Sequence, residues 1–280
     1  FFIYNMIITH DIPWDKCLPH QLFPAIKKGW KDSKMKPIHF FWGLGANNLK
    51  EIAQVKEKGE EWWYVDTGYF TEQIIRYPKP EIHNYARTYF RIIRGGIHTG
   101  GGVYIPESTR LKELQDKAIV GPFQGWSKGR NKVLVCPSSP TVTFHINGIS
   151  QQEWIDQVVA QLKEHTDREI VVRNKPRPGN QWFGTDIKDD LKDTHALVTN
   201  MSLSAIDAIM NMVPAFTHQR NVASQVTSRD IRKIEKPFKP GVKTMREWMM
   251  VMSEHQFTLN EIGSGVAYEA LKRQYENKVL

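Results

Sequence analysis

The second half of the chain alternates short apolar runs with segments of helical periodicity. The apolar runs predict strands at residues 132–136, 169–172, 195–198 and 214–216, and the segments between them predict helices at 150–164, 187–192 and 204–212. Ser150 and Glu153 have the spacing of a capping box at the start of the first of these helices. Strands that alternate with helices in this way predict a parallel, doubly wound sheet.

The first half is less regular. Strands are predicted at residues 1–9, 36–42, 61–65 and 85–93, helices at 22–30 and 47–58, and a weak strand or helix at 111–120. An asparagine, Asn47 or Asn48, is expected to cap the second helix. The glycine-rich segment 121–131 is typical of a linker between domains.

The predicted fold class is therefore α/β, with two Rossmann-like domains facing a cleft. We place the first domain at residues 1–125 and the second at 126–245. Two helices, at 244–252 and 258–275, are expected to close the structure within the C-terminal region 246–280.

The composition of the chain indicates the kind of partner that it is expected to bind. With 280 residues, 40% of them hydrophobic, the chain can bury a sizeable core. Its formal charge of +8 and isoelectric point near 9.3 favour polyanionic partners such as nucleic acid, nucleotides or anionic lipid, although a basic surface also serves simple solubility.

The cysteines and the apolar runs indicate the cellular compartment in which the protein is expected. Cys17 and Cys136 are the only two cysteines, which excludes a disulfide framework and a cysteine-based zinc site and fits a reducing, intracellular compartment. No apolar run approaches the roughly 18 residues of a membrane span, and no signal-peptide pattern is present. We therefore expect a cytoplasmic protein, or a protein of the host cytoplasm if a phage encodes it.

Polar residues follow three predicted strands of the second domain at the point where each strand ends. Because the carboxyl ends of parallel strands share one edge of a sheet, these residues are expected to form an anion pocket, with unpaired N–H groups at the helix start near Ser202. The pocket residues would bind a nucleotide diphosphate without a metal. They are Ser138, Ser139, Arg173, Lys175, Thr199, Asn200, Ser202 and Ser204, with Asp207 as an acceptor for a ribose hydroxyl.

Three of these residues also have a purely structural interpretation. Arg173 and Lys175 could pair with Asp186, Asp189 or Asp190, and Asp207 could be an exposed helix acid.

The segment from Thr199 to Phe216 resembles the donor-domain segment of GT-B-fold glycosyltransferases and their epimerase relatives. In that family a strand, a small polar loop, a helix with an acid and a glycine–aliphatic–proline turn recur. Met212 departs from the pattern by replacing the glycine, so the turn before Pro214 is expected to close differently. More broadly, the order of features over residues 37–271 is similar to a group of phage-encoded proteins of GT-B-like organisation.

This resemblance implies a glycosyltransferase that takes a nucleotide-diphosphate sugar, such as a UDP-sugar, as its co-substrate, with no tightly bound cofactor. The second domain would bind the donor, and a base in the first would deprotonate the acceptor hydroxyl. Asp66 and His98 are the candidate bases, and the sequence does not decide between them. Asp66 could instead cap a turn, and His98 could be a surface residue.

Several residues of the first domain are candidates for binding the acceptor or a phosphate. They are Gly43, Gly45, Gly68, Tyr69 and Arg91. Gly43 and Gly45 match only part of a phosphate-binding glycine pattern. For Arg87, Arg91 and Arg94, ion pairs with Glu61 or Glu72 are an equally good explanation. The histidines show no metal-ligand spacing with carboxylates, so no metal site is predicted.

The basic charge and the phage-like resemblance make DNA carrying a hydroxymethylated base the favoured acceptor. The alternatives are a glycan or small-molecule acceptor, and a non-catalytic nucleic-acid-binding protein of the same fold. The oligomeric state, the sugar and the stereochemical outcome stay open.

Overall fold

We describe a computed structural model of the chain, in which residues 6–10, 18–31, 36–45, 47–75, 81–98, 109–128, 130–175 and 186–276 are described. The described residues form two compact units. The first unit contains the described residues up to His98 together with 109–120 and 250–276, and the second contains 121–249. The long helix α8 (Val242–Ser253) begins in the second unit and ends in the first.

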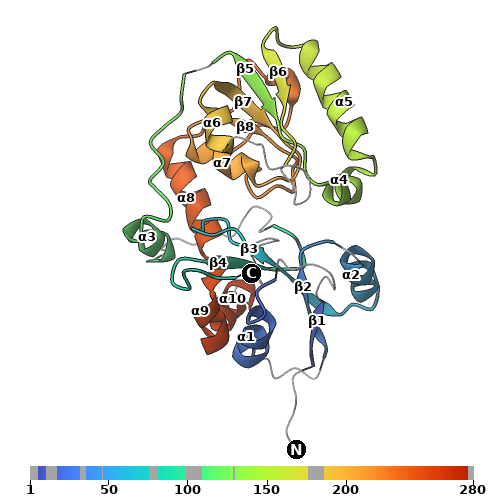
Figure 1. The fold of residues 1–280 in the computed structure, drawn as a ribbon, viewed down its shortest axis with the longest axis vertical. Coiled ribbons are helices and arrows are strands. Elements are labelled where there is room, and N and C mark those ends of the chain that lie inside the picture. The colour runs from blue at the N-terminus through green and yellow to red at the C-terminus, as the bar shows by residue number, and fades with distance from the viewer. Residues whose placement is uncertain are drawn as a thin grey trace, which may run out of the picture. The chain divides into compact units, whose positions relative to one another are not determined.

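The first unit is built on a five-stranded mixed sheet of order β1-β2-β3-β4-β9. Strands β1 (Ile7–His10), β2 (Ile38–Trp42) and β3 (Glu61–Thr67) run parallel, while β4 (Tyr89–Arg94) and β9 (Gln256–Thr258) are antiparallel to their neighbours. The helices are α1 (Leu22–Gly29), α2 (Asn48–Glu57), α3 (Thr109–Asp116), α9 (Leu259–Ser264) and α10 (Val266–Glu276). Figure 1 shows α1, α9 and α10 grouped together.

The two faces of this sheet differ in character. Residues such as Phe40, Val65 and Ile92 alternate along the strands toward one face, where they form a core with α1, α9 and α10. Gly29 of α1 permits the close crossing with α9, because a Cβ at this position would lie 1.8 Å from the carbonyl oxygen of Ile262. The opposite face carries the polar residues His39 and Asp66 together with buried aromatic residues such as Phe41 and Trp62.

The second unit is a four-stranded, all-parallel sheet of order β6-β5-β7-β8, visible in the upper part of Figure 1. Its strands are β5 (Lys132–Val135), β6 (Glu169–Val172), β7 (Thr194–Val198) and β8 (Ala215–Phe216). Its helices are α4 (Pro140–Asn147), α5 (Gln151–Lys163), α6 (Ile187–Leu191), α7 (Ser204–Met210) and the 3₁₀ turn η1 (Ile231–Lys233). Trp154, Ile155, Val158 and Leu162 of α5 pack on the apolar strand residues of one face.

The α/β class is confirmed, and so is the parallel sheet of the second unit. The Ser150–Glu153 capping box is formed in both directions. Other expectations were wrong. The strand expected at 85–93 begins at Tyr89, and neither candidate asparagine caps α2, because Asn47 makes no side-chain cap bond and Asn48 donates to the carbonyl oxygen of Trp42.

Candidate functional site

The strand order of the second unit creates a topological switch point between β5 and β7. The chain leaves β5 for β6 on one side and then returns to place β7 on the other side. Ligands of open parallel sheets bind at the carboxyl ends of the strands at such a point. The loops that leave β5, β6 and β7 at this edge contain residues 136–139, 173–175 and 199–203.

Side chains lock the β5 and β7 loops together. The backbone N–H of Ser138 donates to Asn200 Oδ1 at 3.1 Å, and the N–H of Met201 donates to Ser138 Oγ at 3.0 Å. Asn200 is 2% exposed and also donates to Asn147 Oδ1 at 3.1 Å. Its amide thus holds the loops in place, which leaves it little capacity for a ligand.

The expectation of unpaired N–H groups before α7 was wrong. Besides Met201, Ser202 donates its N–H to Thr199 Oγ1 at 3.3 Å, and Ser204 donates to Ser202 Oγ at 3.2 Å. In a strand–helix loop, the side-chain oxygens of small hydroxyl residues accept hydrogen bonds from nearby backbone N–H groups, and these bonds compete with binding of an anion. Ser204 itself is buried, and its hydroxyl acts on the Cys136 thiol, whose pKa burial raises and this contact lowers.

A helix that the sequence pattern did not indicate starts directly after β5. Ser139 is the N-cap of α4, since its Oγ accepts the N–H of Val142 at 3.3 Å, and Pro140 occupies the first helical turn. Gln151, at the start of α5, donates to the carbonyl oxygen of Ser138 at 2.5 Å. The Ser138–Ser139 turn is therefore rigidly built at the switch point.

Arg173 is paired rather than solitary. Its Nε donates to Asp190 Oδ2 at 2.6 Å, and the two side chains are 18% and 25% exposed. This is one of the structural pairings that the sequence suggested. Lys175 is exposed and precedes the undescribed range 176–185, so the two cations differ in accessibility.

Two titratable groups at this edge have shifted pKa values. Burial raises the pKa of the Cys136 thiol to about 12, against a smaller opposite effect of the Arg173 charge. Asp207 lies in the first turn of α7 and is exposed, yet desolvation, and then the charge of Asp186, raise the pKa of its carboxyl to about 6. The pKa of Asp207 is limited by Lys188 and Arg173, whose charges lower it.

In the first unit, Asp66 belongs to a buried ionic cluster. Its Oδ2 accepts from Arg91 Nη2 at 2.7 Å and from the hydroxyl of Tyr64 at 2.5 Å, and its Oδ1 accepts the N–H of Thr67 at 2.7 Å. Arg91 is 5% exposed, and burial together with Asp66 raises the pKa of Tyr64 well above its usual range. A carboxylate that already accepts three hydrogen bonds has little lone-pair capacity left for an acceptor hydroxyl, so this geometry favours a structural role for Asp66.

His98 stands at the end of an aromatic and cationic stack. The guanidinium of Arg91 lies 5.4 Å from the ring centroid of Tyr69, and the Tyr69 ring stacks on the imidazole of His98 with 6.2 Å between centroids. Both Tyr69 and His98 are buried, at 7% and 8% exposure. The stack brings together Arg91, Tyr69 and His98 from separate parts of the sequence.

The glycine candidates have local structural causes. A Cβ on Gly68 would lie 2.8 Å from the carbonyl oxygen of Tyr89, so glycine is needed there for packing. Gly43 has a φ of 64°, and its N–H donates to the carbonyl oxygen of Val65 at 3.1 Å. The N–H of Asn48 donates to the carbonyl of Gly45 at 3.1 Å. These contacts fix the backbone at the three glycines, and none of them forms part of a phosphate-binding turn.

Two buried amides were missed by sequence reasoning. Asn221 is 0% exposed and donates to the carbonyl oxygens of Asn200 and Ser202 at 3.1 and 3.3 Å. Gln256 of β9 is also 0% exposed and bonds to both the N–H and the carbonyl of Phe70, at 2.8 and 2.7 Å. Both partners are distant in sequence, so no local pattern could reveal these contacts.

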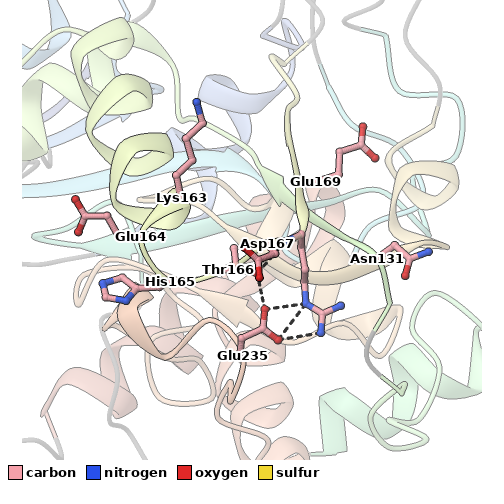
Figure 2. A pocket seen from close by; sticks show the side chains of 9 residues that line it. Asn131, Lys163, Glu164, His165, Thr166, Asp167, Glu169 and Glu235 are labelled. Carbon is pink, nitrogen blue, oxygen red and sulfur yellow. Dashed lines mark hydrogen bonds and ion pairs between the residues drawn. The ribbon is translucent and has the colours of Figure 1, made fainter.

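An open pocket with a volume of about 860 Å³ lies at the amino edge of the second unit's sheet, away from the switch point. Its main feature is an ion pair between Arg168 and Glu235 whose Nη2–Oε2 distance is 2.9 Å, and Thr166 is bonded to the same carboxylate. Figure 2 labels Glu235 and Thr166. These charged groups satisfy one another, and parallel sheets bind ligands at the opposite edge. We therefore place the candidate site at the switch point.

Two further observations concern the described residues only. They contain no cluster of three or more His, Cys, Asp or Glu side chains suited to a metal ion. None of their helices has the length and the apolar character needed to cross a bilayer.

The fold is similar to that of solved bacterial sugar transferases. One solved chain, Thermosulfurimonas dismutans KpsC, beta Kdo 2,4 transferase, superposes with a TM-score of 0.53 at 12% identity, over 95% of this chain and 98% of that one. A second, Thermosulfurimonas dismutans KpsC, beta Kdo 2,7 transferase, has a TM-score of 0.50 at 9% identity, over 95% of this chain and 99% of that one. No protein-family model and no curated protein sequence matches. At such low identity the likeness establishes the glycosyltransferase-like fold.

Proposed function

We propose that the chain is a glycosyltransferase that moves a sugar from a nucleotide-sugar donor to a hydroxyl acceptor. The observation that carries this proposal is the fold, which matches over nearly the whole chain two structures whose names state Kdo transfer. The switch-point geometry of the second unit supports it, because this is where an open parallel sheet accepts a nucleotide.

The donor is proposed to bind at the loops after β5, β6 and β7. Arg173 and Lys175 supply positive charge for the phosphate of the donor, and the Ser138–Ser139 turn supplies hydroxyl groups. Thr199, Asn200 and Ser202 hold the loop after β7 in its shape. Ser204 and Asp207 are the remaining residues that we propose for donor binding. Negative charge that develops on the leaving nucleotide is stabilised by the two cations. A UDP-sugar remains the proposed donor.

The acceptor base is proposed to be His98. Imidazole side chains can take up and release a proton near neutral pH, which suits the role of a general base. Asp66 is the rival, but its carboxylate is occupied by Arg91, Tyr64 and Thr67. In this proposal Asp66 and Arg91 hold Tyr69 in place, and Tyr69 in turn orients His98.

DNA with a hydroxymethylated base is the proposed acceptor, supported by the charge of the second unit. The segment from residue 229 to 243 has six Lys and Arg residues against two acids. Asp230 is paired with Arg232 and Glu235 with Arg168, so the segment keeps an excess of positive charge. Phosphates are the natural counter-charge for such a surface. A glycan acceptor is the second candidate, and the names of the two solved structures favour it.

One experiment tests the activity and separates the acceptors. The protein is incubated with a panel of nucleotide sugars and with hydroxymethylated duplex DNA, unmodified DNA or an oligosaccharide, and nucleotide release and product mass are measured. Transfer to hydroxymethylated DNA alone, with binding that weakens steeply with salt, supports the DNA acceptor. Transfer to the oligosaccharide alone supports the glycan acceptor. No nucleotide release with any pair refutes the proposed activity.

The pocket is tested by substitution. Arg173→Ala is expected to lower turnover at least tenfold, because it removes a charge beside the donor phosphate. Lys192→Ala is the control, since it removes an exposed, carboxylate-paired cation of the same unit that lies outside the proposed acceptor surface. Equal turnover in the two variants would exclude Arg173 from the donor site.

A further inference from the structure

A chain of four hydrogen-bonding side chains lies on the face of the first unit's sheet that carries His39, and the inference drawn from it does not depend on the proposed function. Glu51 Oε2 contacts His10 Nδ1, His10 Nε2 lies 2.9 Å from His39 Nδ1, and His39 Nε2 lies 3.0 Å from Glu60 Oε2. The chain connects α2, the end of β1, the start of β2 and the residue before β3.

The two imidazoles are held firmly. His10 stacks on Phe41, with 4.1 Å between ring centroids and an interplanar angle of 12°. His39 is 6% exposed. Because β1 lies at the edge of the sheet formed by the described residues and pairs there with β2, this chain links β1 to α2.

Counting hydrogens shows what this chain requires. Each of the three contacts joins two atoms that carry lone pairs, so each needs one hydrogen between them. Two neutral imidazoles carry only two hydrogens, and ionised carboxylates carry none. A third proton is therefore needed, which gives the four side chains a net charge of −1. Without it, one contact sets two lone pairs against each other and opens.

We propose that Glu51, His10, His39 and Glu60 form a proton-sharing clasp that closes with a third proton and opens at one of its contacts when that proton is lost. The charged and titratable groups around the clasp determine the pH at which it loses the third proton. Glu51 of α2 and His39 of β2 are the charged or titratable groups that act on His10, and Glu60 faces His39. Lys56 of α2 is held elsewhere, with its ammonium 5.0 Å from the centroid of Trp62.

Burial lowers the pKa of His10 below its ordinary value of 6.5, and the charge of Glu51 opposes this effect. In the folded protein the third proton is therefore bound on the acid side of pH 6.5 and is lost as the pH rises through the folded pKa. Unfolded chains take up the proton first as the pH falls below 6.5, so this site lowers stability on acidification.

The deciding test replaces the third proton with a covalent hydrogen. In Glu51→Gln the side-chain amide can donate to His10 Nδ1, so all three contacts are satisfied by two neutral imidazoles. This variant is expected to melt about 2–4 °C above the wild type at pH 8, the size of one hydrogen bond, and to lose this advantage at pH 5. Glu57→Gln, an exposed position on the same helix, is the control and should show no pH-dependent difference.

A second readout is specific to proton sharing. In the full chain labelled with ¹⁵N-histidine, the ring nitrogens of His10 and His39 should titrate with one common midpoint, and this common step should disappear in Glu51→Gln. His20→Gln removes an exposed histidine and should leave the step unchanged. Separate midpoints for His10 and His39, or a Glu51→Gln variant that is not stabilised at pH 8, would overturn the proposal.

Discussion

Replacement of Asp66 distinguishes a structural from a catalytic carboxylate. The Asp66–Arg91 pair joins facing residues of β3 and β4, and the exposed fractions of the two side chains are 30% and 6%. Asp66→Ala leaves the Arg91 guanidinium buried without its carboxylate, which costs about 3–5 kcal/mol for a buried pair. Because Asp66 is partly exposed, we expect about 3 kcal/mol. For a unit of this size that lowers Tm by about 6–12 °C.

The free energy expected to be lost in Asp66→Ala comes from its pairing with Arg91, so a double-mutant cycle of these two residues measures it. In an Arg91→Met background, Asp66→Ala should cost only about 1 kcal/mol, because no buried charge remains to be stranded. Denaturant unfolding gives the free energies, and hydrogen exchange of the β3 and β4 amides confirms that the first unit is affected. If Asp66→Ala unfolds within about 0.5 kcal/mol of the wild type while turnover is abolished, our interpretation is refuted and Asp66 is the base.

Three further predictions follow from backbone and burial. Gly68→Ala should lose about 1–3 kcal/mol in thermal unfolding through the clash with Tyr89, whereas Gly121→Ala, with open space around it, should be neutral; equal losses would contradict this. Met212→Gly should gain up to about 1 kcal/mol by releasing a left-handed residue, and a loss of stability would show that its side chain matters more than its backbone. Cys136, whose pKa is raised by burial to about 12, should resist iodoacetamide at pH 8 and react in urea; rapid alkylation of the folded protein would disprove its burial.

The second unit was predictable because its signals are local. Its strands are apolar runs, and the Ser150–Glu153 box marks the start of α5 within four consecutive residues. In contrast, β9 is three residues long and pairs with β4, more than 150 positions away in the sequence. No local pattern encodes such a partner, which is why the closing segment was read as helices only.

The turn before Pro214 corrects one expectation in an instructive way. Met212 was expected to force a different turn because the related pattern has glycine there. The structure keeps the glycine-like geometry, with Met212 at a φ of 64° and the N–H of Val213 donating to the carbonyl of Ala208 at 2.9 Å. A non-glycine residue tolerates this conformation at a cost of about 1–2 kcal/mol, so the motif constrains the backbone more strongly than the residue type.

Residue type indicated which side chains carry charge at the strand ends, but it could not indicate whether those charges are already compensated. Arg87 pairs with Glu72, Arg94 with Glu61 and Arg91 with Asp66, so each arginine in this row already has a carboxylate partner. The pairings depend on register across the sheet, which no single-strand pattern contains.

Whether a charge is already compensated also matters at the proposed donor site. Arg173 is bonded to Asp190 at 2.6 Å, so a phosphate that binds it has to compete with a carboxylate that is already in place. A guanidinium has five N–H donors and can serve two anions at once, whereas an ammonium is a compact point charge on a flexible stem. Arg173 is therefore suited to fix the orientation of a phosphate, and exposed Lys175 to supply attraction. In this division of roles Asp190 keeps Arg173 in place before the donor arrives, which lowers the entropy lost on binding.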